Sequence, residues 1–304
     1  FRSRGAKKII VDIDENEIRK ISTRVDLGFS MDAKEFLLHL FKASGRIKID
    51  TSSWLKRCID WKERYPVFIP DFEKAQSGVN TYKLIEVLSD LLTAKDILVP
   101  GSSGSCSEIT MQAFKVKKGQ RVLSSPGLGS MGFGLPASIG ACIASGLKRT
   151  VCIVGDGGLQ HNIQELELLK RYCLPIKVFV LNNNAYASIR ATQEKFFKGH
   201  LVACDPSSGV TLPDTIRISQ AYGLKAFKIV SHSSIEKRVQ RVLNCKGPVI
   251  CDVKIDPAVV TQPRVVSVMT SLGKMASKPM EDLWPFLDRG EFKENMLIKP
   301  LKEE

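Results

Sequence analysis

The sequence predicts an α/β fold built on a doubly wound, mostly parallel sheet. Short aliphatic and β-branched runs of strand length alternate with segments whose apolar residues recur at helical period. Polar, glycine-rich turns follow two of these runs, as in parallel sheets whose strands end at one shared edge. The 304 residues, 43% hydrophobic and 25% charged, are enough to bury the core of one full domain and part of a second.

The pattern divides the chain into four segments. Residues 1–55 contain one predicted strand, Lys8–Ile13, followed by helix-period segments, and are expected to be the edge of a second α/β domain that does not fold alone. Residues 56–78 have prolines and little periodicity, which is typical of a linker. The main domain is predicted at 79–257, and 258–304 as an irregular, charged C-terminal tail.

The main domain is expected to open with an amphipathic helix, because apolar residues between Tyr82 and Leu92 recur at helical spacing. Strands then alternate with helices, which is the doubly wound pattern. The strands are predicted at Ile97–Val99, Val151–Val154, Val178–Leu181, Ala226–Ile229 and Val249–Val253.

The segment from Thr150 to Asn184 is the most informative. The buried-strand run Thr150–Val154 leads into a glycine turn, after which Asn162–Glu165 has the spacing of a helix capping box. Pro175 ends the helix, and Ile176–Leu181 is a second buried strand. The unit is therefore strand, turn, helix, strand, a right-handed crossover whose two strands end at the same edge of the sheet.

The two turns of this unit carry oxygen atoms suited to Mg²⁺ and a phosphate group. Asp156 offers a carboxylate, Asn183 an amide oxygen, and a following backbone carbonyl, that of Ala185, a third ligand. Glycines allow the backbone to approach a phosphate closely. The glycines expected to do so are Gly155, Gly157 and Gly158.

A second polar turn, Pro100–Glu108, follows the strand Ile97–Val99 and precedes a helix. Its N–H groups and hydroxyls are predicted to hold the far end of the same diphosphate. The residues assigned to this role are Ser103, Gly104 and Ser105.

These motifs resemble those of the thiamine-diphosphate enzymes, whose Gly-Asp-Gly and Asn-Asn motif is similar to Asp156 through Asn183. The stretch Gly127–Ala137 resembles that of acetolactate (acetohydroxyacid) synthases, and the likeness extends from Ile10–Asp14 to Gly247–Val253. The resemblance implies that residues 1–55 are the C-terminal part of a central domain. It also implies a thiamine-diphosphate-binding fold for 79–257.

The resemblance implies thiamine diphosphate and Mg²⁺ as cofactors and 2-oxo acid decarboxylation with carboligation as the reaction. Met131 matches the residue that wedges the cofactor into its bent form, and Gly129 the carbonyl that accepts from its amino group. Ala185 and Tyr186 follow the metal motif and are assigned to cofactor binding. The activating glutamate lies in an N-terminal domain of the family, so the chain alone is expected to be inactive.

The resemblance further implies a homodimer or homotetramer with active sites shared between subunits. Asp12–Lys20 and Gly28–Ala33 are similar to pieces of the family's flavin-binding domain, which leaves FAD as an open further cofactor. Branched-chain amino-acid biosynthesis is the implied pathway. The alternative within the superfamily is another thiamine-diphosphate lyase or decarboxylase.

Some positions depart from the synthase pattern. Ser105 and Cys106 replace glutamine and histidine, and Thr192 stands where the biosynthetic synthases place tryptophan. Tyr186 and Arg190 are candidates for orienting a different acceptor. His161, at the expected start of a helix, is either a packing residue or a substrate contact.

Two alternatives come from other classes. Gly127-x-Gly129-x-x-Gly132 fits the dinucleotide fingerprint of an NAD-binding Rossmann domain, but Pro126 separates it from a strand and Asn183 is left unexplained. A non-catalytic regulatory subunit is the other alternative. Cofactor titration combined with a turnover assay separates the three.

Charge and cysteine content limit partners and compartment. The net charge is +13, but Lys and Arg are spread along the chain, so neither a nucleic-acid nor a membrane partner is expected. Eight cysteines without Cys-x-x-Cys spacing predict reduced thiols and a cytoplasmic or organelle-stroma location. The start at Phe1 instead of Met is interpreted as a fragment or a processed form.

Overall fold

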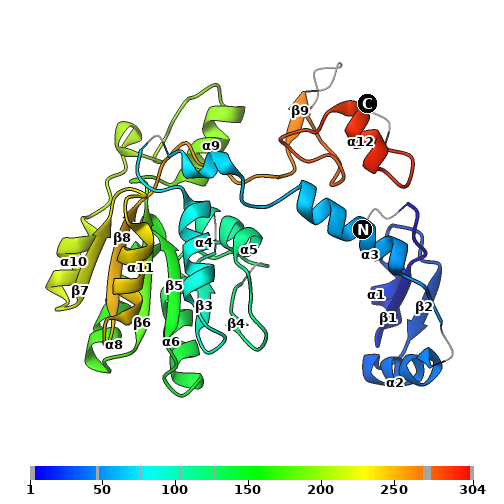
Figure 1. Cartoon of the computed structure of the whole chain (residues 1–304), viewed down its shortest axis with the longest axis horizontal. Coiled ribbons are helices and arrows are strands. Elements are labelled where there is room, and N and C mark those ends of the chain that lie inside the picture. Colours follow the sequence, from blue (N-terminus) through cyan, green and yellow to red (C-terminus); the bar gives the residue numbers. More distant parts are fainter. Residues whose placement is uncertain are drawn as a thin grey trace. The chain divides into compact units, whose positions relative to one another are not determined.

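The computed structural model describes residues 4–45, 48–75, 77–102, 104–125, 127–269 and 275–301 (Figure 1). The chain divides into two compact units. Unit 1 comprises Phe1–Tyr65 with Gln262–Glu304, and unit 2 comprises Pro66–Thr261.

Unit 2 is built on an all-parallel sheet of six strands in the order β4-β3-β5-β6-β8-β7 (Figure 1). The predicted α/β class with a doubly wound parallel sheet is confirmed. The strands are β3 (Ile97–Pro100), β4 (Arg121–Val122), β5 (Thr150–Gly155), β6 (Ile176–Asn182), β7 (Lys225–Ile229) and β8 (Val249–Lys254).

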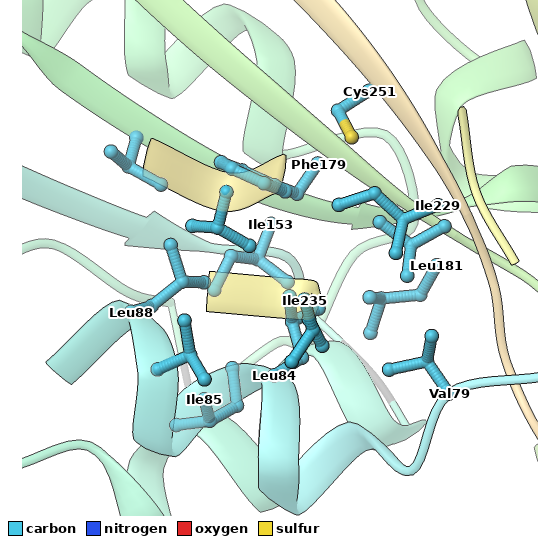
Figure 2. Close-up of a cluster of buried hydrophobic side chains, with 14 of the residues drawn as sticks. Val79, Leu84, Ile85, Leu88, Ile153, Phe179, Leu181, Ile229, Ile235 and Cys251 are labelled. Carbon is cyan, nitrogen blue, oxygen red and sulfur yellow. The ribbon is translucent and has the colours of Figure 1, made fainter. Parts of the chain in front are cut away.

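Helices cover both faces of this sheet because the strands are apolar on both sides. On β5, Val151 and Ile153 pack into one core cluster and Cys152 and Val154 into the other. Figure 2 shows the first cluster, where α4 (Thr81–Leu91) packs beneath the strands. The remaining covering helices are α5 (Glu108–Ala113), α6 (Gly134–Ala144), α8 (Leu166–Arg171), α10 (Thr215–Ala221) and α11 (Ile235–Asn244).

The structure differs from the prediction at the glycine turn. The chain forms helix α7 (Asp156–Gln160) immediately after β5, and the 3-10 turn Ile163–Glu165 then leads into α8. Asn162 makes no side-chain capping bond; its amide donates instead to the Gly132 carbonyl at 2.9 Å. The predicted capping box is therefore wrong, because Asn162 has a tertiary partner.

The first and last segments of unit 2 lie side by side. Val79 forms a parallel bridge with Ile255, in which Val79 N–H donates to the Lys254 carbonyl at 2.8 Å and Asp256 N–H to the Val79 carbonyl at 3.0 Å. Thus the chain enters and leaves the sheet domain at neighbouring points.

Unit 1 contains a two-stranded parallel sheet of β1 (Ile9–Asp12) and β2 (Leu27–Ser30). The C-terminal segment was predicted to be irregular, but two short strands and a helix form in its described part. The other elements of unit 1 are α1 (Glu15–Arg19), α2 (Ala33–Ser44), α3 (Ser52–Arg64), β9 (Ser267–Met269), β10 (Met275–Ser277) and α12 (Arg289–Asn295).

Polar contacts join α3 to α12 within unit 1. Trp61 Nε1 donates to Asn295 Oδ1 at 2.8 Å, and the Tyr65 hydroxyl donates to Glu291 at 2.7 Å. Arg64 pairs with the same Glu291 carboxylate at 2.9 Å. The sequence could not show these pairings, because the partners are separated by more than two hundred positions.

Candidate functional site

A cavity of about 110 Å³ lies at the carboxyl edge of the unit 2 sheet. The loops after β3 and β6 form it together with the start of α7, which directly follows β5, and the segment before α6. Its lining comprises Gly101, Ser102, Gly104, Ser105, Cys106, Met131, Gly132, Gly134, Val154, Gly155, Asp156, Gly157, Gly158, Leu181, Asn183, Ala185, Tyr186, Ala187, Ser188 and Ile189. Sequence positions far apart therefore meet where parallel-sheet proteins place their ligands.

Asp156 is the acidic residue of this lining. Its side chain is buried, with Oδ2 accepting from Asn184 N–H at 2.7 Å and Oδ1 from Gly157 N–H at 2.8 Å. Burial raises the pKa of Asp156 to about 6, although these backbone donors act in the opposite direction. Among the described residues no Lys or Arg pairs with it, so the carboxylate lacks a counter-ion from the chain.

The three asparagines at the end of β6 and directly after it have different roles. Asn182 turns to the next strand and donates to Asp252 Oδ1 at 2.8 Å. Asn183 lines the cavity, and its Oδ1 accepts from Ala185 N–H at 3.2 Å. Asn184 adopts a left-handed conformation (φ 56°), which presents its N–H to Asp156. Only the middle asparagine therefore offers its side chain to a ligand in the cavity.

Gly157 is required by a close approach of Tyr186. A Cβ at Gly157 would lie 2.2 Å from Tyr186 Cε1, so the tyrosine ring packs directly on the first turn of α7. Tyr186 is itself held by its N–H, which donates to the Cys204 carbonyl at 2.8 Å. The contact joins the start of α7 and the loop after β6 into one wall of the cavity.

The segment before α6 is held to the cavity by two side chains. Gly132 has φ 89°, and its carbonyl accepts from Asn162. The Ser102 hydroxyl donates to the Ser130 carbonyl. Met131, which is 37% exposed, lies between these anchors and borders the cavity. The backbone around Met131 is therefore fixed while its side chain stays accessible.

The structure gathers most of the predicted site residues in one place. Gly104, Ser105, Met131, Gly155, Asp156, Gly157, Gly158, Asn183, Ala185 and Tyr186 all line the cavity. Gly129 does not line it; it has φ 59° and lies against the Ser102 carbonyl. Ser103 lies outside the described residues.

Other candidates lie apart from the cavity. His161 is exposed and packs its Cβ near Gly132, and it is not in the lining. Arg190, on α9 (Ala187–Phe196), pairs with Glu194 at 2.8 Å and with Asp205 at 3.3 Å. These ion pairs occupy the guanidinium that the sequence offered for orienting an acceptor.

Sequence reasoning missed Ser102, Asn162 and Ile189. The first two act by holding backbone carbonyls across the cavity, a role that leaves no motif. Ile189 follows the metal motif at helical spacing from Tyr186, and this spacing is the one signal that was available.

The donors present fit a metal-bound diphosphate. A buried carboxylate without a cationic partner, an adjacent amide oxygen and the glycines at the start of α7 face one small cavity. Oxygen ligands of this kind suit Mg²⁺, and the positive charge of a metal would offset the burial that raises the Asp156 pKa.

Comparison with known proteins agrees with this chemistry. The family model for the thiamine pyrophosphate enzyme, C-terminal TPP binding domain, matches residues 102–253, half of the chain. The chain belongs to the thiamine pyrophosphate enzymes. The suspected family is thereby confirmed, and thiamine diphosphate is the cofactor that its matched domain binds.

Relatives of this thiamine pyrophosphate enzyme are acetolactate synthases. The acetolactate synthase large subunit of Cyanidium caldarium is 32% identical over 257 residues, 82% of this chain and 42% of the relative. Acetolactate synthase 2, chloroplastic, of Nicotiana tabacum is 30% identical over 262 residues, 83% of this chain and 38% of the relative. The probable large subunit of Methanococcus aeolicus is 31% identical over 265 residues, 84% and 44% respectively.

This chain therefore spans about two fifths of the length of the curated relatives it matches. Among its described helices, none has the length and apolar character needed to cross a membrane. All eight cysteines are free thiols.

The Rossmann alternative does not fit the geometry of the glycine segment. A dinucleotide fingerprint needs its first glycine in the turn directly after a strand. Here β4 ends at Val122, so Gly127 is well separated from it, and α6 begins only at Gly134. The glycines serve the cavity segment that Asn162 and Ser102 hold.

Proposed function

We propose that unit 2 holds thiamine diphosphate through Mg²⁺ in the carboxyl-edge cavity and serves 2-oxo acid decarboxylation and carboligation of the acetolactate synthase type. The observation that carries the proposal is the buried, unpaired Asp156 carboxylate beside Asn183. The metal ligands are assigned to Asp156 Oδ, Asn183 Oδ1 and the Ala185 carbonyl.

The chain's own groups bind the cofactor and position it. The N–H groups and small residues of the loop after β3 and of the start of α7 are assigned to the phosphate oxygens, and Met131 to the support of the cofactor ring. Thiamine diphosphate, when bound, supplies the carbanion chemistry that cleaves 2-oxo acids and forms new carbon–carbon bonds. The protein supplies orientation and exclusion of water.

The size of the cavity supports a shared site. At about 110 Å³ it is smaller than the roughly 300 to 1,000 Å³ of pockets that enclose a whole small molecule. We infer that another domain or subunit completes it, as in a homodimer or homotetramer. FAD is not included in the proposal. In the described part of residues 1–55, which resemble the flavin-binding domain, the strands form one two-stranded sheet, β1–β2.

Titration calorimetry of thiamine diphosphate with and without Mg²⁺ tests the assignment. Asp156→Ala is expected to abolish Mg²⁺-dependent binding, and Asn183→Ala to weaken it less, because the first removes the charged ligand. Asp252→Ala and Asn182→Ala are matched controls, since these residues contact each other beside the cavity and do not line it. Unchanged affinity in Asp156→Ala would contradict the proposal.

Reaction type needs a separate measurement. Product analysis with a panel of 2-oxo acids, on the assembled protein, distinguishes a carboligase from a lyase or decarboxylase of the same superfamily. Acetolactate from pyruvate is the expected product. Arg190 is ion-paired, and neither Arg190 nor Thr192 lines the cavity. Selection of the acceptor substrate is therefore assigned to lining residues such as Ile189.

A further inference from the structure

The amino edge of the unit 2 sheet, opposite the cavity, collects basic residues from four of its six turns and from the helix and strand ends beside the turns. The strands start in register there: Ile97 is opposite Arg121 and Thr150, Thr150 opposite Ile176, and Val249 opposite Lys177 and Lys225. At about 4.8 Å between strands, the six turns that precede them form a row about 25 Å wide.

Four of these turns carry Lys or Arg, and the other two are flanked by basic residues at the end of α8 and the start of β7. The basic residues of this amino-edge face are Lys95, Lys115, Lys117, Lys118, Arg121, Lys148, Arg149, Lys170, Arg171, Lys225 and Lys246. The single acid in the turns, all of which are described, is Asp96. Eleven of the 45 Lys and Arg residues, which are dispersed in the sequence, therefore lie at one edge, because the fold brings every strand start there.

Contacts between the turns confirm that they form one surface. Arg149 binds Asp96 through two nitrogens, at 2.6 and 2.7 Å. Lys170 Cε lies 3.4 Å from the position of a Cβ on Gly223, and Gln120 Nε2 donates to the Thr93 carbonyl at 3.0 Å. Neighbouring turns therefore touch along the edge.

Internal neutralisation accounts for part of this charge. Helices that cover the sheet end at this edge, and each helix C-terminus offers roughly half a negative charge, about three charges for six helices. Arg149 is neutralised by Asp96, and Lys117 donates to the Ser89 carbonyl. Among described residues, however, Lys118, Lys148 and Lys246 have no ion-pair partner and are exposed. A positive surplus remains.

Exposed apolar side chains are interspersed with the cations. Val116, Ile143, Leu147 and Tyr172 lie in or beside the same turns, and each is more than half exposed. Surfaces that bind single-stranded nucleic acid use exposed aromatic side chains for stacking, whereas here the Arg171 guanidinium lies over the Tyr172 ring at 5.8 Å and Tyr222 is half-buried. Aliphatic tips among lysines are instead typical of surfaces that lie on anionic bilayers.

We propose that this amino-edge face is a peripheral docking surface for an anionic phospholipid bilayer. The cations contact headgroups while Leu147 and its apolar neighbours enter the interface. The carboxyl-edge cavity then faces away from the lipid. This surface is independent of cofactor binding and of the reaction.

Vesicle flotation of the 304-residue chain tests the proposal, using phosphatidylcholine alone and phosphatidylcholine with roughly one third phosphatidylserine. Binding is expected to the anionic vesicles only, and to be lost when salt rises from about 0.1 to 1 M, which shortens the Debye length from about 10 to 3 Å. The triple reversal Lys118→Glu, Arg171→Glu, Lys246→Glu is expected to lower partitioning by on the order of 100-fold or more.

The control reverses the same number of charges elsewhere in unit 2, with Lys237→Glu, Arg238→Glu and Lys254→Glu, and should retain most of the binding. Leu147 has a left-handed φ of 63°, which Asn tolerates. Leu147→Asn is therefore expected to weaken vesicle binding without changing the charge or straining the backbone. Equal loss in both triple variants would overturn the proposal. So would an absence of vesicle binding combined with salt-sensitive binding of duplex DNA.

Discussion

The protonation of Asp156 couples fold stability to the ligand. Its folded pKa of about 6 exceeds the ordinary value of 3.8, so between these pH values the folded state holds a proton that the unfolded state has released. The free energy of unfolding of the ligand-free protein is therefore expected to fall by about 2 kcal/mol as pH rises from about 4 to 7. Urea denaturation at a series of pH values measures this.

Asp156→Asn should remove most of that fall and raise stability at neutral pH, while eliminating stabilisation by Mg²⁺ with thiamine diphosphate. Asp252→Asn is the matched control, since burial also raises the pKa of that carboxylate. Its response to Mg²⁺ should be retained. A Mg²⁺ response that persists in Asp156→Asn would remove this residue from the metal site.

Met131 offers a second prediction. Because the side chain is 37% exposed, Met131→Ala should destabilise the fold by less than the roughly 2 to 5 kcal/mol of a fully buried methionine. Cofactor affinity should stay nearly constant while turnover of the assembled protein falls, since misplacement reduces rate first. Calorimetry and single-turnover rates separate these effects, and lost affinity with a normal rate per bound cofactor would exclude the wedge role.

At the scale of elements, the loop before α6 depends on Gly132. An added Cβ there would lie 2.5 Å from Asn162 Nδ2 and 2.8 Å from His161 Cβ, at φ 89°. Gly119 has a similar φ of 82° with no atom within 4 Å of its added Cβ, so Gly119→Ala isolates the backbone effect, about 1 kcal/mol.

Gly132→Ala is expected to cost about 1 to 3 kcal/mol more than Gly119→Ala, because it also forces α7 away from the loop. Urea midpoints of the two variants give the difference. Equal destabilisation by Gly132→Ala and Gly119→Ala would mean that Asn162 can move away from the added Cβ without a free-energy cost.

The elements that sequence reasoning found are those with long apolar runs. β5, β6 and β8 are buried on both faces, so their composition alone marked them as central strands. β4, with only Arg121 and Val122, has too few residues for any periodicity. Asn162 was misassigned because its spacing fits a local cap, whereas its partner Gly132 is thirty positions away.

Among site residues, Asp156 and Asn183 were predictable because both belong to short motifs directly after strands. The positions of Ser102 and Ile189 depend on how loops from different strands meet. The basic amino-edge face was missed for the same reason. Its residues are dispersed in sequence and adjacent only through strand register.

At the scale of the whole molecule, a polypeptide of residues 1–304 alone is expected to release no carbon dioxide from pyruvate with cofactor and Mg²⁺ in excess. Asp156 is the one carboxylate among the described residues that line the cavity, and it is assigned to the metal. No described acid there is left to activate a cofactor. Cofactor binding, measured in parallel, is the control that the cavity has formed. Sustained carbon dioxide release would show that a base within these residues suffices.

The bridge between Val79 and Ile255 has a consequence for how this sheet domain can be moved between proteins. An insert whose ends are adjacent can be placed in a host loop without separating the host's own segments. The chain passes from unit 1 to unit 2 after Tyr65 and returns to unit 1 at Gln262. Within unit 2, the entering and leaving segments are hydrogen-bonded to each other at Val79 and Ile255. The cofactor domain is thus a portable module, one that recombination could exchange between hosts or a protein engineer could graft as a single cassette.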